Sequence, residues 1–234
     1  MQLFYNSDIK KGDSNFFFDK EESKHIVKVL RKKESDKIFI TNGLGFLFES
    51  EIILASEKKC EVKITKETFQ EPDAFYTHIA VAPTKMNDRL EWFLEKATEI
   101  GIHEITPIIC DHSERKVYKI DRAEKIIQAA MKQSLHYYIP KINEPISFSQ
   151  FVKSNIDGQK FIAHCEETDK KSFKNEVNKS EKATILIGPE SDFTTQEINL
   201  AIENNFIPVT LGNTRLRTET AALVACHTIA LINE

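Results

Sequence analysis

The stretch Leu211-Gly212-Asn213-Thr214-Arg215-Leu216-Arg217-Thr218-Glu219-Thr220 joins a predicted strand, Pro208–Gly212, to a final helix that is apolar on nearly every side. Neighbouring residues of an extended chain face opposite ways. We therefore expect Arg215 and Arg217 to point to one side of this loop and Leu216 to the other.

The end of the same stretch predicts a helix start. Thr218 is a candidate N-cap, and Glu219 stands in the first turn, where the helix dipole favours an anion. One interpretation is a capped helix preceded by two solvated arginines. The other is a ligand pocket in which an arginine meets a phosphate or a developing anion.

Two further loops carry polar residues at the ends of predicted strands. Strand Lys160–Cys165 runs into His164–Glu167, and strand Thr184–Gly188 runs into Gly188–Phe193. Ligands of open α/β sheets bind beyond the carboxyl ends of the strands. Glycine at such an end permits close approach of a ligand, although a tight turn explains it equally well. Several such loops in one domain favour a pocket.

Strands and helices alternate from about Glu71 to the C-terminus. Alternation of this kind indicates an α/β domain with a mainly parallel sheet and helices on both faces. A further helix, Thr194–Asn205, is expected between strands Thr184–Gly188 and Pro208–Gly212. The elements expected before strand Lys160–Cys165 are strand Tyr76–Ala82, helix Asp88–Ile100, strand Glu104–Cys110, helix Asp121–Leu135 and helix Ser147–Lys153.

The first seventy residues read mainly as short strands, which favours a small barrel or sandwich. One helix, about Glu21–Lys32, interrupts them, and Asn42-Gly43-Leu44-Gly45 reads as a hairpin connection because Asn and Gly tolerate positive φ. The expected strands are Gln2–Asn6, Asn15–Asp19, Lys37–Thr41, Phe46–Leu54 and Cys60–Lys66.

Composition excludes several classes. The formal net charge is −4 and 41% of residues are hydrophobic, so a nucleic-acid ligand would need a local basic surface. The four cysteines lie far apart, which favours free thiols in a reducing cytosol over a disulfide framework or a zinc site. There is no signal-peptide pattern, G-x-G-x-x-G fingerprint or Walker A loop. We expect a cytoplasmic soluble protein without a metal.

Several of these motifs together resemble the ribosomal RNA small subunit methyltransferase E family, a group of SPOUT-type methyltransferases. The resemblance covers nearly the whole chain in order, and its C-terminal motif is specific. It is carried by His25, Val29-Leu30-Arg31, Lys85, Arg89, Glu95–Gly101, Ile105–Pro107, Gln133-Ser134, Ile187–Phe193 and Leu211–Ala221.

The resemblance implies transfer of a methyl group from S-adenosylmethionine (SAM) to ring nitrogen 3 of a uridine in small-subunit (16S) ribosomal RNA. It implies a PUA-like β-barrel for RNA over residues 1–70, and a SPOUT-type α/β domain with a C-terminal trefoil knot over residues 71–234. It also implies a homodimer.

By position, the resemblance also implies site residues. Those for the cofactor are His164, Glu166, Leu186, Gly188, Glu190, Leu211, Gly212, Leu216, Thr218, Thr220 and Ala221. Those for RNA are His25, Lys28, Arg31, Lys85, Arg89 and Arg115.

The reaction suggests roles for three residues. Uracil must lose its imino proton before it attacks the methyl carbon, and charge then appears on its oxygens. We expect Arg217, or failing that Arg215, to stabilise this charge. Glu219 would orient the arginine or assist proton removal.

One departure from the family stands beside Pro189-Glu190. The family usually has two glycines there, where this chain has Ser191 and Asp192. Side chains at these positions would narrow or stiffen the loop. They also motivate the alternative hypothesis of an RNA-binding protein that keeps the fold without catalysis. A nucleotide-dependent oxidoreductase is disfavoured by the missing glycine fingerprint.

Overall fold

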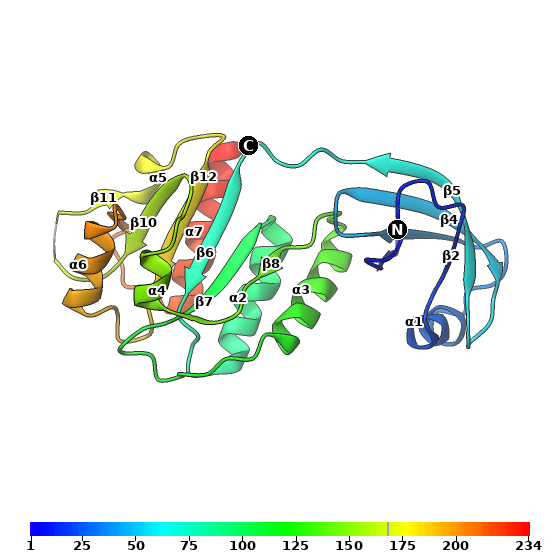
Figure 1. The fold of residues 1–234 in the computed structure, drawn as a ribbon, viewed down its shortest axis with the longest axis horizontal. Helices are drawn as coiled ribbons and strands as arrows, with labels where there is room; N and C mark the ends of the chain where they lie inside the picture. The colour runs from blue at the N-terminus through cyan, green and yellow to red at the C-terminus, as the bar shows by residue number, and fades with distance from the viewer. Residues whose placement is uncertain (168) are drawn as a thin grey trace. The chain divides into compact units, whose positions relative to one another are not determined.

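The computed structural model describes residues 1–167 and 169–234, which form two compact units (Figure 1). Unit 1 comprises residues 1–72 and 131–139, and unit 2 comprises residues 73–130 and 140–234. None of the described helices is long and apolar enough to cross a membrane.

Unit 1 is built on a five-stranded sheet in the order β1-β3-β4-β5-β2. β3 and β4 are joined through Asn42–Gly45, where Gly43 and Gly45 have φ of 74° and 90°; the predicted turn is confirmed. Phe4, Ile26 and Phe48 are buried in its core. The strands are β1 (Leu3–Tyr5), β2 (Asn15–Phe17), β3 (Lys37–Thr41), β4 (Phe46–Leu54) and β5 (Glu61–Phe69).

The helix predicted over Glu21–Lys32 is shorter and changes type. The side chain of Asp19 accepts a hydrogen bond from the Glu22 N–H, so α1 (Lys20–Lys24) begins one residue early. It continues as the π-helix η1 (His25–Val29). At Arg31 the backbone turns left-handed, with φ of 53°, which ends the helix.

The predicted boundary at residue 70 misses one segment of unit 1. Residues 131–139 belong to unit 1 and pair with the β3–β4 turn. Tyr137 O accepts hydrogen bonds from Gly45 N at 2.9 Å and from Thr41 Oγ1 at 3.1 Å, and Ile139 N donates to Gly43 O at 3.0 Å. Such contacts span nearly a hundred residues, so composition does not reveal them.

Unit 2 contains an eight-stranded sheet whose described strand pairs are all parallel. Its main order is β11-β13-β10-β12-β6-β7-β8, and β9 pairs with β7. The strands are β6 (Tyr76–Val81), β7 (Glu104–Ile109), β8 (Lys141–Ile142), β9 (Ile146–Ser147), β10 (Gln159–Ala163), β11 (Lys171–Ser172), β12 (Lys182–Ile187) and β13 (Ile207–Thr210).

Helices cover both faces of this sheet, as predicted. Figure 1 shows α7, in red, running behind β6; it packs on β6, β12 and α2. On the other face α4 and α6 bury Phe151 and Ile198 in a common core with Ala80 of β6 and Leu186 of β12. The helices are α2 (Asn87–Ile100), α3 (Asp121–Ser134), α4 (Phe148–Val152), α5 (Phe173–Glu176), α6 (Thr195–Glu203) and α7 (Thr218–Asn233).

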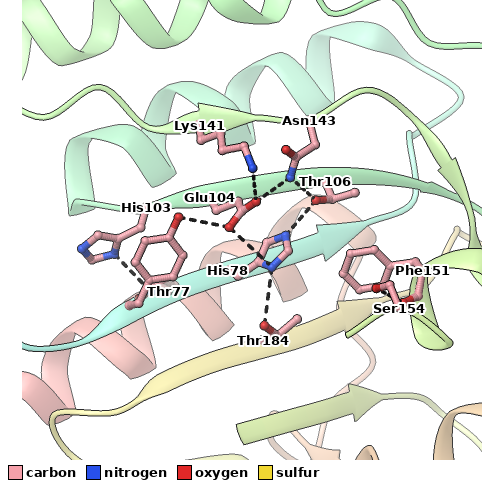
Figure 2. A network of polar contacts seen from close by, with 11 residues as sticks. Thr77, His78, His103, Glu104, Thr106, Lys141, Asn143, Phe151, Ser154 and Thr184 are labelled. Atoms are coloured by element: carbon pink, nitrogen blue, oxygen red, sulfur yellow. Dashed lines mark hydrogen bonds and ion pairs between the residues drawn. The ribbon is translucent and has the colours of Figure 1, made fainter. Parts of the chain in front are cut away.

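A network of polar side chains lies at the amino end of this sheet (Figure 2). Glu104 at the start of β7 accepts hydrogen bonds from Tyr76 Oη at 3.0 Å, Lys141 Nζ at 3.0 Å and Asn143 Nδ2 at 2.7 Å. Burial raises the pKa of Glu104, but these hydrogen bonds and the nearby charges outweigh it, and the pKa is lowered. The network satisfies its own polar groups and lies opposite the predicted site.

His78 in the same network makes stability depend on pH. Its Nε2 lies 2.7 Å from Thr106 Oγ1, and burial lowers its pKa from 6.5 to about 4, although the charge of Glu104 opposes this. The neutral form is therefore favoured on folding. The contribution of neutral His78 to the free energy of unfolding is complete above about pH 6.5 and is lost as the pH falls through about 4.

Because of His78, we expect the free energy of unfolding to fall by about 2 kcal/mol when the pH is lowered from 7 to 5. Urea unfolding at both pH values measures this loss, and His78→Gln, which cannot titrate, is the control. An equal pH dependence in the two proteins would contradict the prediction.

Candidate active site

The three predicted loops meet at the carboxyl end of the parallel sheet. Ala163 pairs with both Ile187 and Val209, so β10, β12 and β13 end side by side. Two cavities open beyond these ends. The β13 cavity, of about 420 Å³, is lined by His164 and residues 209–216, and the β12 cavity, of about 270 Å³, by Gly188–Glu190 and residues 215–218. Both share Ala163, Cys165, Arg215, Leu216 and Ala221.

Eight of the eleven predicted cofactor residues line these cavities: His164, Gly188, Glu190, Leu211, Gly212, Leu216, Thr218 and Ala221. Thr220 lines neither. The Glu166 carboxylate instead accepts a hydrogen bond from Thr195 Oγ1 at 2.6 Å. The Leu186 side chain is fully buried in the core beneath α4 and α6, because alternation along β12 places it on the sheet face that these helices cover.

Thr218 is not the N-cap of α7 that the sequence suggested. The N-cap of α7 is Arg217, and Thr218 is the first helical residue. Its buried hydroxyl donates to Gly188 O at 3.0 Å, so it joins the loop after β13 to the loop after β12. The hydrogen bond fixes the start of α7 beside both cavities.

The two glycines of the site serve different purposes. Gly212 has φ of 144°, and a Cβ there would meet nothing within 4 Å, so its backbone is open to a ligand. A Cβ at Gly188 would lie 3.1 Å from the Phe193 ring. Gly188 therefore allows the core residue Phe193 to pack closely.

His164 is buried, and neither ring nitrogen has a hydrogen-bond partner within the described chain. Burial lowers its pKa, and the charge of Lys170 lowers it further. Lys170 also donates to the carbonyl oxygens of His164, at 2.8 Å, and Glu166, at 2.6 Å. The ring is thus a neutral imidazole with an unused donor and acceptor at the cavity wall.

The two arginines of the last loop are exposed, and the Leu216 side chain between them is half-buried. Arg217 lines the β12 cavity, whereas Arg215 lines both. For the residues that the structure describes, neither guanidinium makes a hydrogen bond or an ion pair. Both are free to meet an anion.

Glu219 is buried in the first turn of α7 and faces α2. Its Oε1 lies 3.9 Å from Arg89 Nε, and its Oε2 is buried without a partner among residues 1–167 and 169–234. The arginine beside Glu219 is therefore Arg89, which the sequence suggested for RNA. Arg217 forms no pair with it.

Lys85 and Arg115, both predicted for RNA, gather beside Glu190. Lys85 N donates to Glu190 Oε1 at 2.9 Å, and Arg115 Nη2 donates to Lys85 O at 2.9 Å. Lys85 Nζ lies 2.8 Å from Glu114 Oε2, an exposed pair of small energetic value. Sequence reasoning missed Glu114, since nothing in its neighbourhood marked it.

The other predicted RNA residues lie in unit 1. His25 and Lys28 are on η1, and Arg31 follows it. His25 Nδ1 lies 3.0 Å from Glu22 Oε1 on the preceding turn. The structure thus brings these three residues together on one short helical segment.

Sequence reasoning also missed one polar residue of the strand-end loops and the contact made by another. Lys170 holds the loop after β10 through its carbonyls, as described above, and lay in a lysine-rich stretch without a motif. Asp192 accepts a hydrogen bond from Cys165 N across the cavity. Only its departure from the family's glycine marked it. Within the described ranges, no three His, Cys, Asp or Glu residues gather as a metal site.

Comparison with known proteins covers both units. The family described as "RNA methyltransferase domain" matches residues 71–230, and "RNA methyltransferase PUA domain" matches residues 18–65. Ribosomal RNA small subunit methyltransferase E of Buchnera aphidicola subsp. Acyrthosiphon pisum is 32% identical over 91% of this chain and 86% of its own. The Bacillus subtilis protein of the same name is 28% identical over 92% and 89%.

Solved structures share the fold along the whole chain. A Porphyromonas gingivalis protein described as a probable rRNA-methyltransferase is 37% identical with a TM-score of 0.91, covering 100% of this chain and 98% of its own. A Legionella pneumophila protein, solved with the bound cofactor SAM, is 26% identical with a TM-score of 0.88, covering 99% and 97%.

Proposed function

Because this chain belongs to the ribosomal RNA small subunit methyltransferase E family, we propose that it methylates ring nitrogen 3 of a uridine in small-subunit (16S) ribosomal RNA, using SAM. The observation that carries the proposal is the pair of joined cavities at the ends of β10, β12 and β13, with two unpaired arginines at their rim. Cavity and arginines provide a place for a cofactor and a place for developing negative charge.

The residues present fit SAM. Gly212 leaves its backbone accessible, Leu216 gives an apolar wall, and the unsatisfied His164 ring offers polar atoms at the cavity wall. Together with Leu211, Ala221 and the Gly188–Glu190 loop they would hold the cofactor. SAM supplies a methyl group on a positively charged sulfur.

The chain's own contribution is to hold the uracil and stabilise its anion. Loss of the N3 proton places negative charge on the uracil oxygens beside the reacting nitrogen. Arg217, at the rim of the β12 cavity, can donate to such an oxygen without first breaking a pair. Arg215, which lines both cavities, is the second candidate. Glu219 would act through Arg89, because its carboxylate is buried against α2.

RNA would contact both units. Lys85 and Arg115 surround Glu190 at the edge of the β12 cavity, and His25, Lys28 and Arg31 stand on one segment of unit 1. Lysine and arginine side chains position RNA through its phosphates. We assign residues 1–70 and the segment 131–139 to a PUA-like RNA-binding domain, a role supported by the family match over residues 18–65.

We further propose a trefoil knot and a homodimer. The strand order β11-β13-β10-β12-β6 and the return of α7 to β6 and β12 support the knot. Exposed Trp92 on α2 and Leu231 on α7, two helices that pack on each other, support a dimer. A crystal structure of the purified chain tests both, since an unthreaded chain or a monomer would contradict them.

The function is tested by incubating the purified chain and SAM with either naked 16S ribosomal RNA or the assembled small subunit. Methylation at N3 removes the hydrogen that uridine uses for base pairing, so reverse transcription should stop at one uridine. Mass spectrometry of the digested RNA should show a single methylated uridine. Methylation of a carbon or a ribose would contradict the N3 assignment. Calorimetric SAM binding without any methylation would instead favour the catalytically inactive alternative.

A further inference from the structure

Asp192 adopts a backbone conformation that usually needs glycine. Its φ is 69°, and its N–H donates to Pro189 O at 2.9 Å to close a tight turn after β12. Asp tolerates this left-handed region better than most residues but still at a cost. Glycine would take the same turn without strain. The side chain must therefore provide something that a glycine lacks.

That side chain joins two loops that are distant in sequence. Asp192 Oδ2 accepts a hydrogen bond from Cys165 N at 2.6 Å, and its Oδ1 accepts one from Phe193 N at 2.9 Å. The first bond crosses from the loop after β12 to the loop after β10. Hydrogen bonds to a carboxylate are stronger than those between neutral groups.

The bond forms where the sheet can no longer hold the chain. Pairing between β10 and β12 ends at Ala163 and Ile187, so Cys165 N lies beyond the ladder. Cys165 and Asp192 both line the β12 cavity. With glycine at position 192, the Cys165 N–H would lose its acceptor. The loop after β10 and the loop after β12 would then no longer be joined by this hydrogen bond.

We infer that Asp192 is a positioning residue that locks the loop after β10 against the loop after β12, so that the cofactor cavity is formed before SAM arrives. The inference rests on the proposed function, because it takes the cavity to be the SAM site. A site that is ordered in advance binds more tightly, since less conformational freedom is lost on binding. The carboxylate therefore stiffens a loop that glycine at position 192 would leave free.

The test compares Asp192→Gly and Asp192→Asn with Ser191→Gly as the matched control. Ser191 is the exposed neighbour, and its side chain makes no hydrogen bond to the rest of the described chain. Amide hydrogen exchange at Cys165, followed by NMR without SAM, reports the link itself. Calorimetry reports SAM affinity. Both readouts are independent of methylation.

In Asp192→Gly, we expect exchange at Cys165 to quicken by about tenfold or more and SAM affinity to fall about tenfold, the size expected for one charged hydrogen bond. In Asp192→Asn, whose amide oxygen can still accept, both effects should be smaller. Ser191→Gly should match the wild type. This ordering distinguishes a positioning carboxylate from general loosening of the loop.

Two results would overturn the inference alone: unchanged exchange at Cys165 in Asp192→Gly, or faster exchange with unchanged SAM affinity. If the wild-type chain failed to bind SAM, the proposed function would fall, and the cofactor role of Asp192 with it. Melting curves check that each variant is folded. If Asp192→Gly does not fold, the comparison of Asp192→Asn with the wild type still tests the inference.

Discussion

Replacement of Arg217 by alanine is expected to lower the single-turnover rate of uridine methylation by about 10²–10³-fold, with SAM affinity nearly unchanged. Arg217 is exposed at the rim of the β12 cavity and has no ion-pair partner within the described residues. Arg217 can therefore donate hydrogen bonds to the negatively charged uracil oxygens without first breaking an ion pair. A donor needed only in the transition state affects the rate and spares ground-state binding.

Arg215→Ala is the matched control, since Arg215 stands two residues earlier on the same loop. Because Arg215 lines both cavities, we expect its removal to weaken SAM binding more than it slows the chemical step. Quench-flow with saturating RNA and SAM separates the two effects. A full rate in Arg217→Ala with a large loss in Arg215→Ala would transfer the catalytic role to Arg215.

Much of the fold follows from local patterns. β3 and β4 match the predicted strands Lys37–Thr41 and Phe46–Leu54 to the residue, because alternating side chains and the Asn42–Gly45 turn define both ends. The predicted helix Thr194–Asn205 is also present as α6, which begins with a capping box between Thr194 and Glu197. Where local signals agree with the tertiary structure, sequence suffices.

Other features depend on contacts that no local pattern contains. The π-helical turn at His25–Val29 ends the first helix early, although its composition suits a longer α-helix. Residues 131–139 join unit 1 because Tyr137 O accepts a hydrogen bond from Thr41, 96 residues earlier in the chain. Hydrophobic periodicity describes one helix or strand at a time and does not predict contacts between residues that are distant in the sequence.

The site shows the same division. Strand ends and glycines indicated which loops meet, and eight predicted cofactor residues line the cavities. The Leu186 side chain lies in the core, so a cofactor role for this residue would use its backbone and stays a prediction. The Asp192–Cys165 and Glu219–Arg89 contacts join separate elements, and only the structure reveals them.

Replacement of Glu219 by glutamine is expected to slow methylation by about tenfold to a hundredfold and to leave the shape of the pH–rate profile unchanged. Glutamine keeps the size of the side chain but removes the charge that faces Arg89, 3.9 Å away. Displacement of Arg89 would shift the start of α7 and with it Arg217. A general base would behave differently, because its loss would remove the acid limb of the profile.

The partner variant, Arg89→Ala, tests whether the two residues act as one unit. If Glu219 works through Arg89, the double variant should be little slower than either single variant, because the second change removes an interaction that is already lost. The burial of Glu219 argues for this outcome: its Oε2 is enclosed and its Oε1 points to α2, so neither oxygen is presented to a base at the rim. A loss beyond about 10³-fold in Glu219→Gln, together with a vanished acid limb and additive effects of Arg89→Ala, would make Glu219 the base instead.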